Sequence, residues 1–137
     1  MEKAATLTGR ILLGHIFLLA GISKIGGYEA TAGWMEAMGV PGGLLPLVIA
    51  LEIGGGLALI LGFQARLAAL GLAAFSIVSA VIFHADFSDQ MQSILFMKNF
   101  AMAGGLLYVA AFGAGAWSVD AKIKRSRSDI SARATAV

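Results

Sequence analysis

The chain has 137 residues, of which 58 % are hydrophobic and only 13 % are charged, with a formal net charge of +2 at pH 7. Soluble domains usually carry about 25 % charged residues, so this composition excludes an ordinary water-soluble domain. The sequence contains no cysteine, which excludes disulfides, thiol catalysis and cysteine-held metal or iron–sulfur centres.

Long apolar runs predict four membrane-spanning helices, placed in chain order at 7–26, 43–62, 67–84 and 94–117. Residues 67–83 carry no charge over 17 positions, and residues 99–119 carry none over 21. A helix needs about 20 mostly apolar residues to cross the hydrocarbon core of a bilayer. We therefore predict an all-α integral membrane protein, an antiparallel four-helix bundle embedded in a lipid bilayer.

The first predicted helix has a short uncharged part, 13 residues from Ile11 to Ser23. To span, it must bring Arg10 and Lys24 to the membrane edges, where long basic side chains can snorkel. The segment also looks like a secretory signal peptide, but His15 interrupts its apolar part and no Ala-x-Ala site follows, which favours a retained helix. One helix face collects residues at 4-3-4-3 spacing: Arg10, Gly14, Phe17, Gly21 and Lys24.

The second predicted helix contains one charged residue, Glu52, in an otherwise apolar run. Gly55 and Gly56 follow three and four positions later, on the same helix face. Small residues on a membrane helix let a neighbouring helix approach closely. We therefore expect Glu52 to point into a tight helix–helix seam and away from lipid.

The connecting segments suggest the orientation. Eight of the ten basic residues lie on the side that holds both ends of the chain, which predicts that both termini face the cytoplasm. The outer segment 27–43 contains Trp34 between acidic residues and is expected to lie as an amphipathic piece in the interface. We assign 1–120 to the membrane domain and 121–137 to a basic cytoplasmic tail, either disordered or lying on anionic headgroups.

Antiparallel threading brings the polar positions of the helices to comparable depths. Glu52 lies about 12–13 Å below the outer end of its helix, at 1.5 Å per residue. This predicts a pocket that opens to the outer face, with Glu52 and His84 as catalytic candidates. The ligand-binding candidates are Lys24, Glu52, His84, Lys98, Asn99 and His15.

Each candidate also has a purely structural interpretation. Glu52 could form a buried ion pair with a nearby lysine or histidine, and His15 could bond a neighbouring helix. His84, Lys24 and Lys98 could be interface anchors, and Arg66 could simply mark the topology. No His-x-x-x-His or similar spacing predicts a metal site, and no basic patch of the nucleic-acid-binding kind is present.

The ordered landmarks of the chain resemble the DoxX family of small four-helix bacterial membrane proteins. They are "RILLGHIFLLAGISKI" with Arg10 and Lys24, "PLVIALEIGGGLALILGFQARLAAL" with Glu52, "FHADF" with His84, and "KNFAMAGGLLYVAAFGAGAWSVD" with Lys98 and Asn99. The resemblance covers Arg10 to Asp120 and implies a multi-pass protein of the bacterial cytoplasmic (inner) membrane. Related members are associated with thiosulfate:quinone oxidoreductase or with redox-stress complexes.

Three functions remain open at this stage. The first is a quinone-binding or redox-accessory subunit of an oxidoreductase, in which the polar candidates hold the quinone headgroup; it implies a quinone and other redox subunits as partners. The second is a small proton-coupled transporter or channel with Glu52 as carrier, which would need a homo-oligomer. The third is a non-catalytic scaffold or assembly factor that recruits a partner through its tail.

Overall fold

The computed structural model describes residues 1–136, and Val137, the last residue of the expected tail, lies outside them. The described chain is helical, without a strand. Its elements are α1 Glu2–Gly26, α2 Tyr28–Ala37, the short 3-10 helix η1 Gly42–Leu44, α3 Leu45–Leu61, α4 Ala65–Phe83, α5 Gln90–Phe112 and α6 Val119–Thr135. Four of these segments are long and apolar enough to cross a membrane, which confirms the predicted all-α class.

Three ends of the predicted helices differ from the structure by four residues or more: the first helix begins at Glu2 instead of at 7, and the fourth helix differs at both ends. The fourth span ends at Phe112, not at 117, because Gly113 and Gly115 adopt φ values of +86° and +79° that break the helix. The same helix begins at Gln90 because the carboxylate of Asp89 accepts hydrogen bonds from the backbone N–H groups of Met91 and Gln92. The prediction placed both ends of this fourth helix by hydropathy alone, and hydropathy does not detect the residues that cap a helix.

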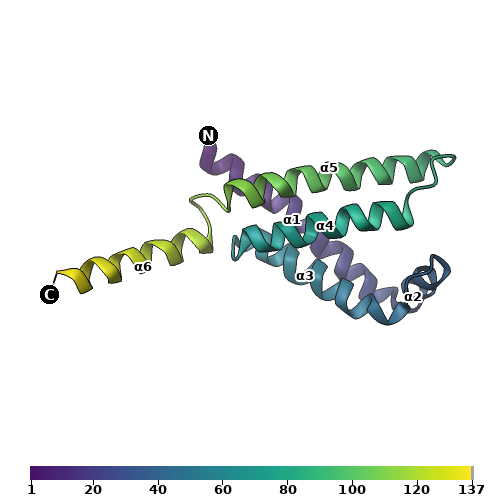
Figure 1. Ribbon diagram of the computed structural model, residues 1–137, viewed down its shortest axis with the longest axis horizontal. Helices are drawn as coiled ribbons and strands as arrows, with labels where there is room; N and C mark the ends of the chain where they lie inside the picture. Colours follow the sequence, from purple (N-terminus) through teal and green to yellow (C-terminus); the bar gives the residue numbers. More distant parts are fainter. Residues whose placement is uncertain (137) are drawn as a thin grey trace.

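The spans pack as two antiparallel pairs, α1 with α3 and α4 with α5, and a weaker contact between α3 and α4 joins the pairs. Figure 1 shows α4 and α5 side by side, while α1 and α3 run together and diverge from them toward α2. We call the end with α2 and the α4–α5 turn the α2 end. The opposite end, with the α3–α4 turn and the start of α6, is the termini end.

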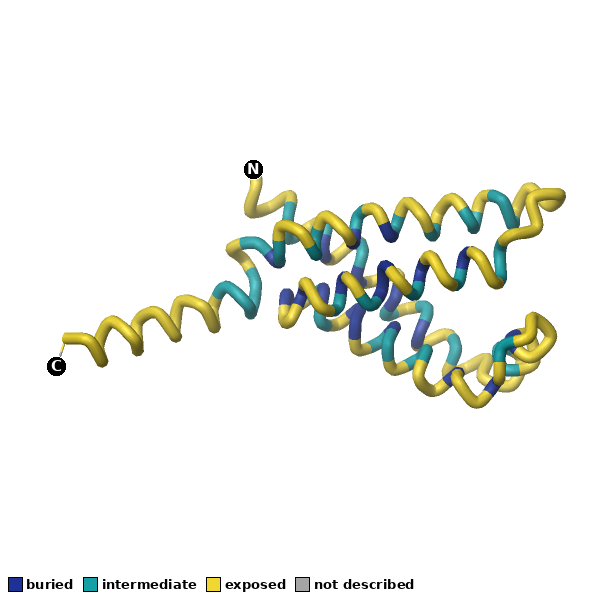
Figure 2. The backbone as a smooth tube through the Cα atoms, in the orientation of Figure 1, coloured by how far each residue is buried: buried dark blue, intermediate teal, exposed yellow. Residues whose placement is uncertain are grey.

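The buried core lies where the pairs meet, nearer the termini end. It consists of Phe17, Leu59, Ala69, Leu72, Ala73, Ala103 and Leu106. Most other large apolar side chains point outward, so the outer surface of the spans is largely exposed (Figure 2). This distribution is expected of helices that face lipid, because lipid tails are as apolar as a protein core.

Glycines bring α1 and α3 into close contact. A Cβ atom on Gly14 would lie 2.7 Å from the carbonyl oxygen of Gly56, and a Cβ on Gly56 would lie 2.7 Å from the oxygen of Gly14. The predicted glycine seam is therefore present. Gly55, however, faces Leu72 of α4, whose side-chain carbons would lie 3.0 Å from an added Cβ. The two adjacent glycines thus serve two different helix contacts.

Arg10 is buried at the termini end and does not snorkel to water as expected; only 2 % of it is exposed. Its Nη1 donates hydrogen bonds to the carbonyl oxygens of Leu59 (2.7 Å) and Ile60 (3.2 Å), at the end of α3. Its Nη2 donates to the oxygen of Trp117 in the α5–α6 loop, at 2.6 Å. The last carbonyls of a helix lack partners within it, so a guanidinium satisfies them well.

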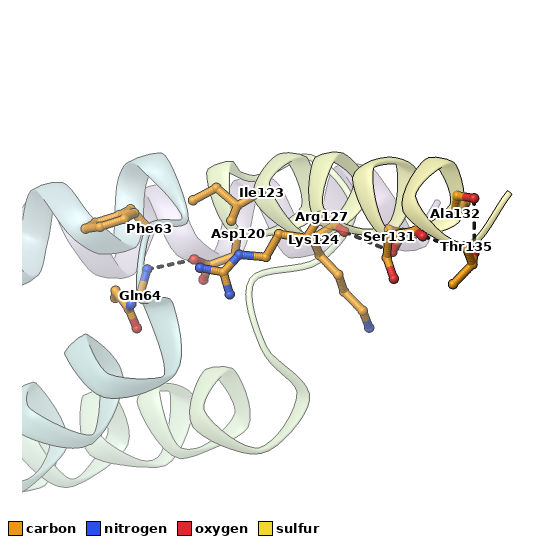
Figure 3. Close-up of a pocket in the computed structure, with 10 residues that line it drawn as sticks. Phe63, Gln64, Asp120, Ile123, Lys124, Arg127, Ser131, Ala132 and Thr135 are labelled. Carbon is orange, nitrogen blue, oxygen red and sulfur yellow. Dashed lines mark hydrogen bonds between the residues drawn. The ribbon is translucent and has the colours of Figure 1, made fainter. Parts of the chain in front are cut away.

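Asp120 and Arg66 complete the ties at this end. The carboxylate of Asp120 accepts a hydrogen bond from the N–H group of Gln64 at 2.8 Å (Figure 3). It accepts a second from the N–H group of Ala65 at 3.0 Å, and so caps α4 from a distant part of the chain. Arg66 donates to the carbonyl oxygens of Ala110 (3.0 Å) and Ala111 (2.8 Å), near the end of α5. Arg66 is thus more than a topological marker, because it links α4 to α5.

The tail is helical, which contradicts the first of its two expected states, the disordered one, and leaves the second, a tail lying on anionic headgroups, as a prediction. α6 runs to Thr135, and the hydroxyl of Ser118 caps it by accepting the N–H of Ala121 at 3.1 Å. It extends away from the bundle along the long axis of the molecule (Figure 1), and it has no buried residue. Asp120 therefore fixes the base of α6, while the rest of the helix is free of the membrane helices.

Candidate functional site

A pocket of about 310 Å³ lies between the diverging helix pairs at the α2 end, and every helix from α1 to α5 contributes to its wall. Five of the six ligand-binding candidates line it: Lys24, Glu52, His84, Lys98 and Asn99. Apolar side chains make up most of the remaining wall, among them Phe17, Val48, Phe75 and Met102. The structure therefore brings these polar residues, far apart in sequence, to a single site.

Lys24 and Glu52 form an ion pair in the wall of this pocket. The Nζ atom of Lys24 lies 3.0 Å from Oε1 and 2.9 Å from Oε2 of Glu52, and it donates a well-directed hydrogen bond to Oε1. Oε2 is buried and accepts no directed hydrogen bond from the described residues. Glu52 is only 3 % exposed, because Gly21 lets α1 close over its helix. Both carboxylate oxygens thus lie against the ammonium of Lys24.

His84 ends α4 and lies at another wall of the pocket. Its Nδ1 is 2.7 Å from Oε1 of Gln92, in the first turn of α5. This contact fixes the orientation of the imidazole, and the other ring nitrogen, Nε2, is the one left to meet a ligand. The ring of Trp34 lies 6.1 Å from the imidazole and 4.7 Å from Phe83, between centroids, which restricts the motion of His84.

Asn99 and Lys98 come from adjacent positions of α5. The Nδ2 of Asn99 donates to the backbone oxygen of Leu95 at 2.9 Å, which orients its amide. Lys98 is exposed, and its side chain belongs both to this pocket and to a shallower apolar hollow beside it. The two residues therefore stand at the outer part of the site, while the ion pair is the buried part.

His15, the sixth candidate, does not take part. It lies on the exposed side of α1, outside the residues that line the pocket, and its Nδ1 contacts the carbonyl oxygen of Leu12 at 2.7 Å. His15 has the same depth along its helix as the other candidates, but it lies on a side of the helix that faces away from the pocket. The residues from 1 to 136 also contain no group of three histidine or acidic side chains able to hold a metal ion.

Asp86, two residues after His84, lies in the exposed α4–α5 turn and does not line the pocket. There the hydroxyl and then the amide of Ser88 hydrogen-bond to its carboxylate and lower the pKa of the group. The carboxylate of Asp86 therefore stabilises the turn, beside Asp89, which caps α5.

Helix α2 supplies residues that the sequence did not assign to the site. Met35 is 5 % exposed and Trp34 is half-exposed, and both line the pocket together with Thr31. The adjacent residues Trp34 and Met35 in an otherwise polar outer segment could have indicated that this segment packs over an apolar surface. Gln92 offered no such signal, because only the fold brings it to His84.

The combination of groups limits what the pocket can hold. A charged pair lies on one wall, an oriented imidazole on another, and aromatic and aliphatic side chains line the space between them. Ligand sites commonly have this form, a mostly apolar cavity with a few polar groups that fix orientation. The pocket suits a small molecule with an apolar body and two or more polar atoms on its ring or head.

Comparison with known proteins agrees with the architecture. The DoxX family matches residues 5–85. The chain is 48 % identical to the inner membrane protein YqjF of Escherichia coli (strain K12) over 120 residues, 88 % of this chain and 92 % of that protein. It is 32 % identical to the inner membrane protein YphA of the same organism over 121 residues, covering 83 % and 86 % of the two chains.

A third relative carries a functional name. The Bacillus subtilis (strain 168) protein named "Putative oxidoreductase CatD" is 31 % identical over 80 residues, 58 % of this chain and 59 % of that protein. No solved structure matches the chain. With the family match over residues 5–85 and four helices that can span a bilayer, the chain belongs to the DoxX family and is a multi-pass inner membrane protein.

Proposed function

We propose that the protein is a quinone-binding, redox-accessory subunit whose pocket at the α2 end opens to the outer face of the membrane, with both termini in the cytoplasm. The observation that carries this proposal is the buried Lys24–Glu52 pair in the wall of a mostly apolar pocket. The ammonium can donate to a quinone carbonyl, and the carboxylate can exchange protons with it. The name of the CatD relative fits an oxidoreductase role.

His84 provides the second contact in this proposal. A quinone has oxygens at opposite ends of its ring, so two polar groups on different walls are needed to hold it. A hydrogen on Nε2 of the imidazole, which Gln92 orients through Nδ1, and the ammonium of Lys24, which Glu52 holds in place, satisfy that requirement. Reduction of a quinone takes up two electrons, which a partner redox subunit would supply, and two protons, which Glu52 and His84 can pass on when they are protonated. The apolar hollow beside Lys98 offers a place for the isoprenoid tail.

A proton-coupled channel has less support from the packing. Below Glu52, toward the termini end, Phe17 and Leu59 are 4 % and 0 % exposed, and the backbones of Gly14 and Gly56 are in close contact. A conducting path would have to pass through this tightly filled region. The pocket is therefore better described as a site with one entrance than as part of a pathway across the membrane.

Replacing Glu52 with glutamine is expected to lower quinone affinity at least about tenfold, equivalent to about 1.4 kcal/mol. The substitution keeps the shape of the side chain but removes the negative charge that holds Lys24 in place. Quinone retained by protein purified in native-lipid particles, measured by mass spectrometry and by titration with an added quinone, provides the readout.

His15→Gln is the matched control, because it changes an ionisable residue of a spanning helix that lies outside the pocket. It should retain quinone as the parent protein does. Finding only phospholipid with the parent protein, or equal retention by the Glu52→Gln and His15→Gln variants, would contradict the proposal. Circular dichroism establishes that both variants remain folded.

A further inference from the structure

A second cavity, of about 570 Å³, lies at the termini end between the start of α1 and the end of α5. Its α1 wall consists of Glu2, Thr6, Gly9, Arg10 and Leu13. The opposite wall consists of Gly105, Tyr108, Val109 and Phe112 of α5, together with Gly113, which follows that helix. It shares no residue with the pocket at the α2 end. Tyr108 and Phe112 are 71 % and 76 % exposed, so the cavity is a groove with an outward-facing aromatic rim.

The α1 wall of the groove has a definite chemical order. Glu2 is at the outermost turn, Thr6 follows one turn deeper, Arg10 lies about 12 Å from Glu2 along the helix axis, and Leu13 comes last. The sequence of groups is thus acidic, hydroxyl, basic and apolar, from the membrane surface inward. A phospholipid with an ammonium headgroup has the complementary order: ammonium, phosphate and then acyl chains.

Arg10 brings a positive charge to the groove, and Asp120 lies near enough to attract it but forms no salt bridge with it. Within residues 1–136 the Lys24–Glu52 pair is the salt bridge that forms, and Arg10 donates only to uncharged carbonyl oxygens. Its Nε is buried without a hydrogen-bond partner among these residues. A buried polar donor of this kind ordinarily has an acceptor, and a phosphate or ester oxygen in the groove would supply one.

From these features we infer that the groove is a binding site for a zwitterionic phospholipid of the phosphatidylethanolamine type. The phosphate lies toward Arg10, the ammonium toward Glu2, and an acyl chain follows the apolar part of the groove past Leu13 and Val109. An anionic lipid such as phosphatidylglycerol would satisfy Arg10 but would leave its headgroup beside the carboxylate of Glu2. The site therefore selects for the ammonium headgroup.

Two glycines make a matched test. A Cβ atom at Gly9 would meet no atom within 4 Å, and the same holds for Gly104 on α5, but only Gly9 lines the groove. Gly9→Leu should fill the groove without disturbing the helix, whereas Gly104→Leu adds the same side chain elsewhere. Both changes raise helix propensity equally. The proteins are reconstituted in nanodiscs with equal amounts of phosphatidylethanolamine and phosphatidylglycerol, and native mass spectrometry measures the lipid they retain.

The parent protein and Gly104→Leu should retain phosphatidylethanolamine in preference to phosphatidylglycerol, and Gly9→Leu should retain at least tenfold less. Glu2→Gln, an exposed change at the first helical residue, should reduce the preference severalfold while lipid is still retained. Equal retention by the two leucine variants, or a preference of the parent protein for phosphatidylglycerol, would overturn the inference. If Gly9→Leu does not fold, the headgroup preference of Glu2→Gln decides, and an unchanged preference overturns it.

Discussion

Replacing Arg10 with methionine is expected to lower the free energy of unfolding by about 3–5 kcal/mol. The side chain makes three hydrogen bonds to carbonyl oxygens, and bonds from charged donors are worth about 1.5–3 kcal/mol each without being strictly additive. Its loss removes the tie between α1, the end of α3 and the α5–α6 loop. Arg10→Lys should rescue little, because one ammonium cannot match the spread of a planar guanidinium.

Arg127→Met is the control for this change. Arg127 lies exposed on α6 and makes no hydrogen bond within the part of the chain that the structure describes. Its substitution should alter stability by no more than about 0.5 kcal/mol. Unfolding of both variants by denaturing detergent in mixed micelles, followed by circular dichroism, gives the comparison. Equal stabilities for the two variants would mean that Arg10 does not hold the termini end together.

The second large effect is expected at the crossing of α1 and α3. In Gly14→Ala the new Cβ would lie 2.7 Å from the backbone oxygen of Gly56 and 2.8 Å from Cγ1 of Ile60, so the two helices must separate. Overpacking of this kind costs about 1–3 kcal/mol. The separation would also move Lys24 away from Glu52, so binding at the pocket should weaken together with stability.

Gly54→Ala is the matched control, because a Cβ at Gly54 would meet nothing within 4 Å. It should leave thermal stability unchanged or raise it slightly through better helix propensity. Gly56→Ala should resemble Gly14→Ala, and the double variant should cost less than the sum, because one methyl group already separates the helices. Additive losses in the double variant, or a loss in Gly54→Ala as large as that in Gly14→Ala, would refute the close crossing.

Much of the fold follows from patterns in the sequence. Hydropathy located all four spans, and the spacing of Gly14, Phe17 and Gly21 identified the buried face of α1. Depth along the helices also grouped Lys24 and Glu52, because antiparallel spans of similar length must place their ends at the same levels. These predictions succeed since they depend only on local periodicity and on the thickness of the bilayer.

What the sequence did not reveal depends on contacts between distant residues. His15 has the right depth, but the rotation of α1 turns it away from the pocket. Arg10 was expected to reach water, yet its Nη atoms donate to the carbonyls of Leu59 and Trp117 inside the protein. Asp120 caps α4 by accepting the N–H of Ala65, 55 residues away in the sequence, and no local sequence pattern predicts such a pairing.

The central claim, a quinone site at the α2 end, is tested most directly by photolabelling with a quinone that carries an azide on its ring. Cross-linked residues are then mapped by peptide mass spectrometry. The claim predicts labels on pocket residues such as Met35, Phe75 and Met102, removed by excess unmodified quinone and reduced in Glu52→Gln. Labels confined to lipid-facing residues such as Leu12 and Leu19, and insensitive to competition, would contradict it.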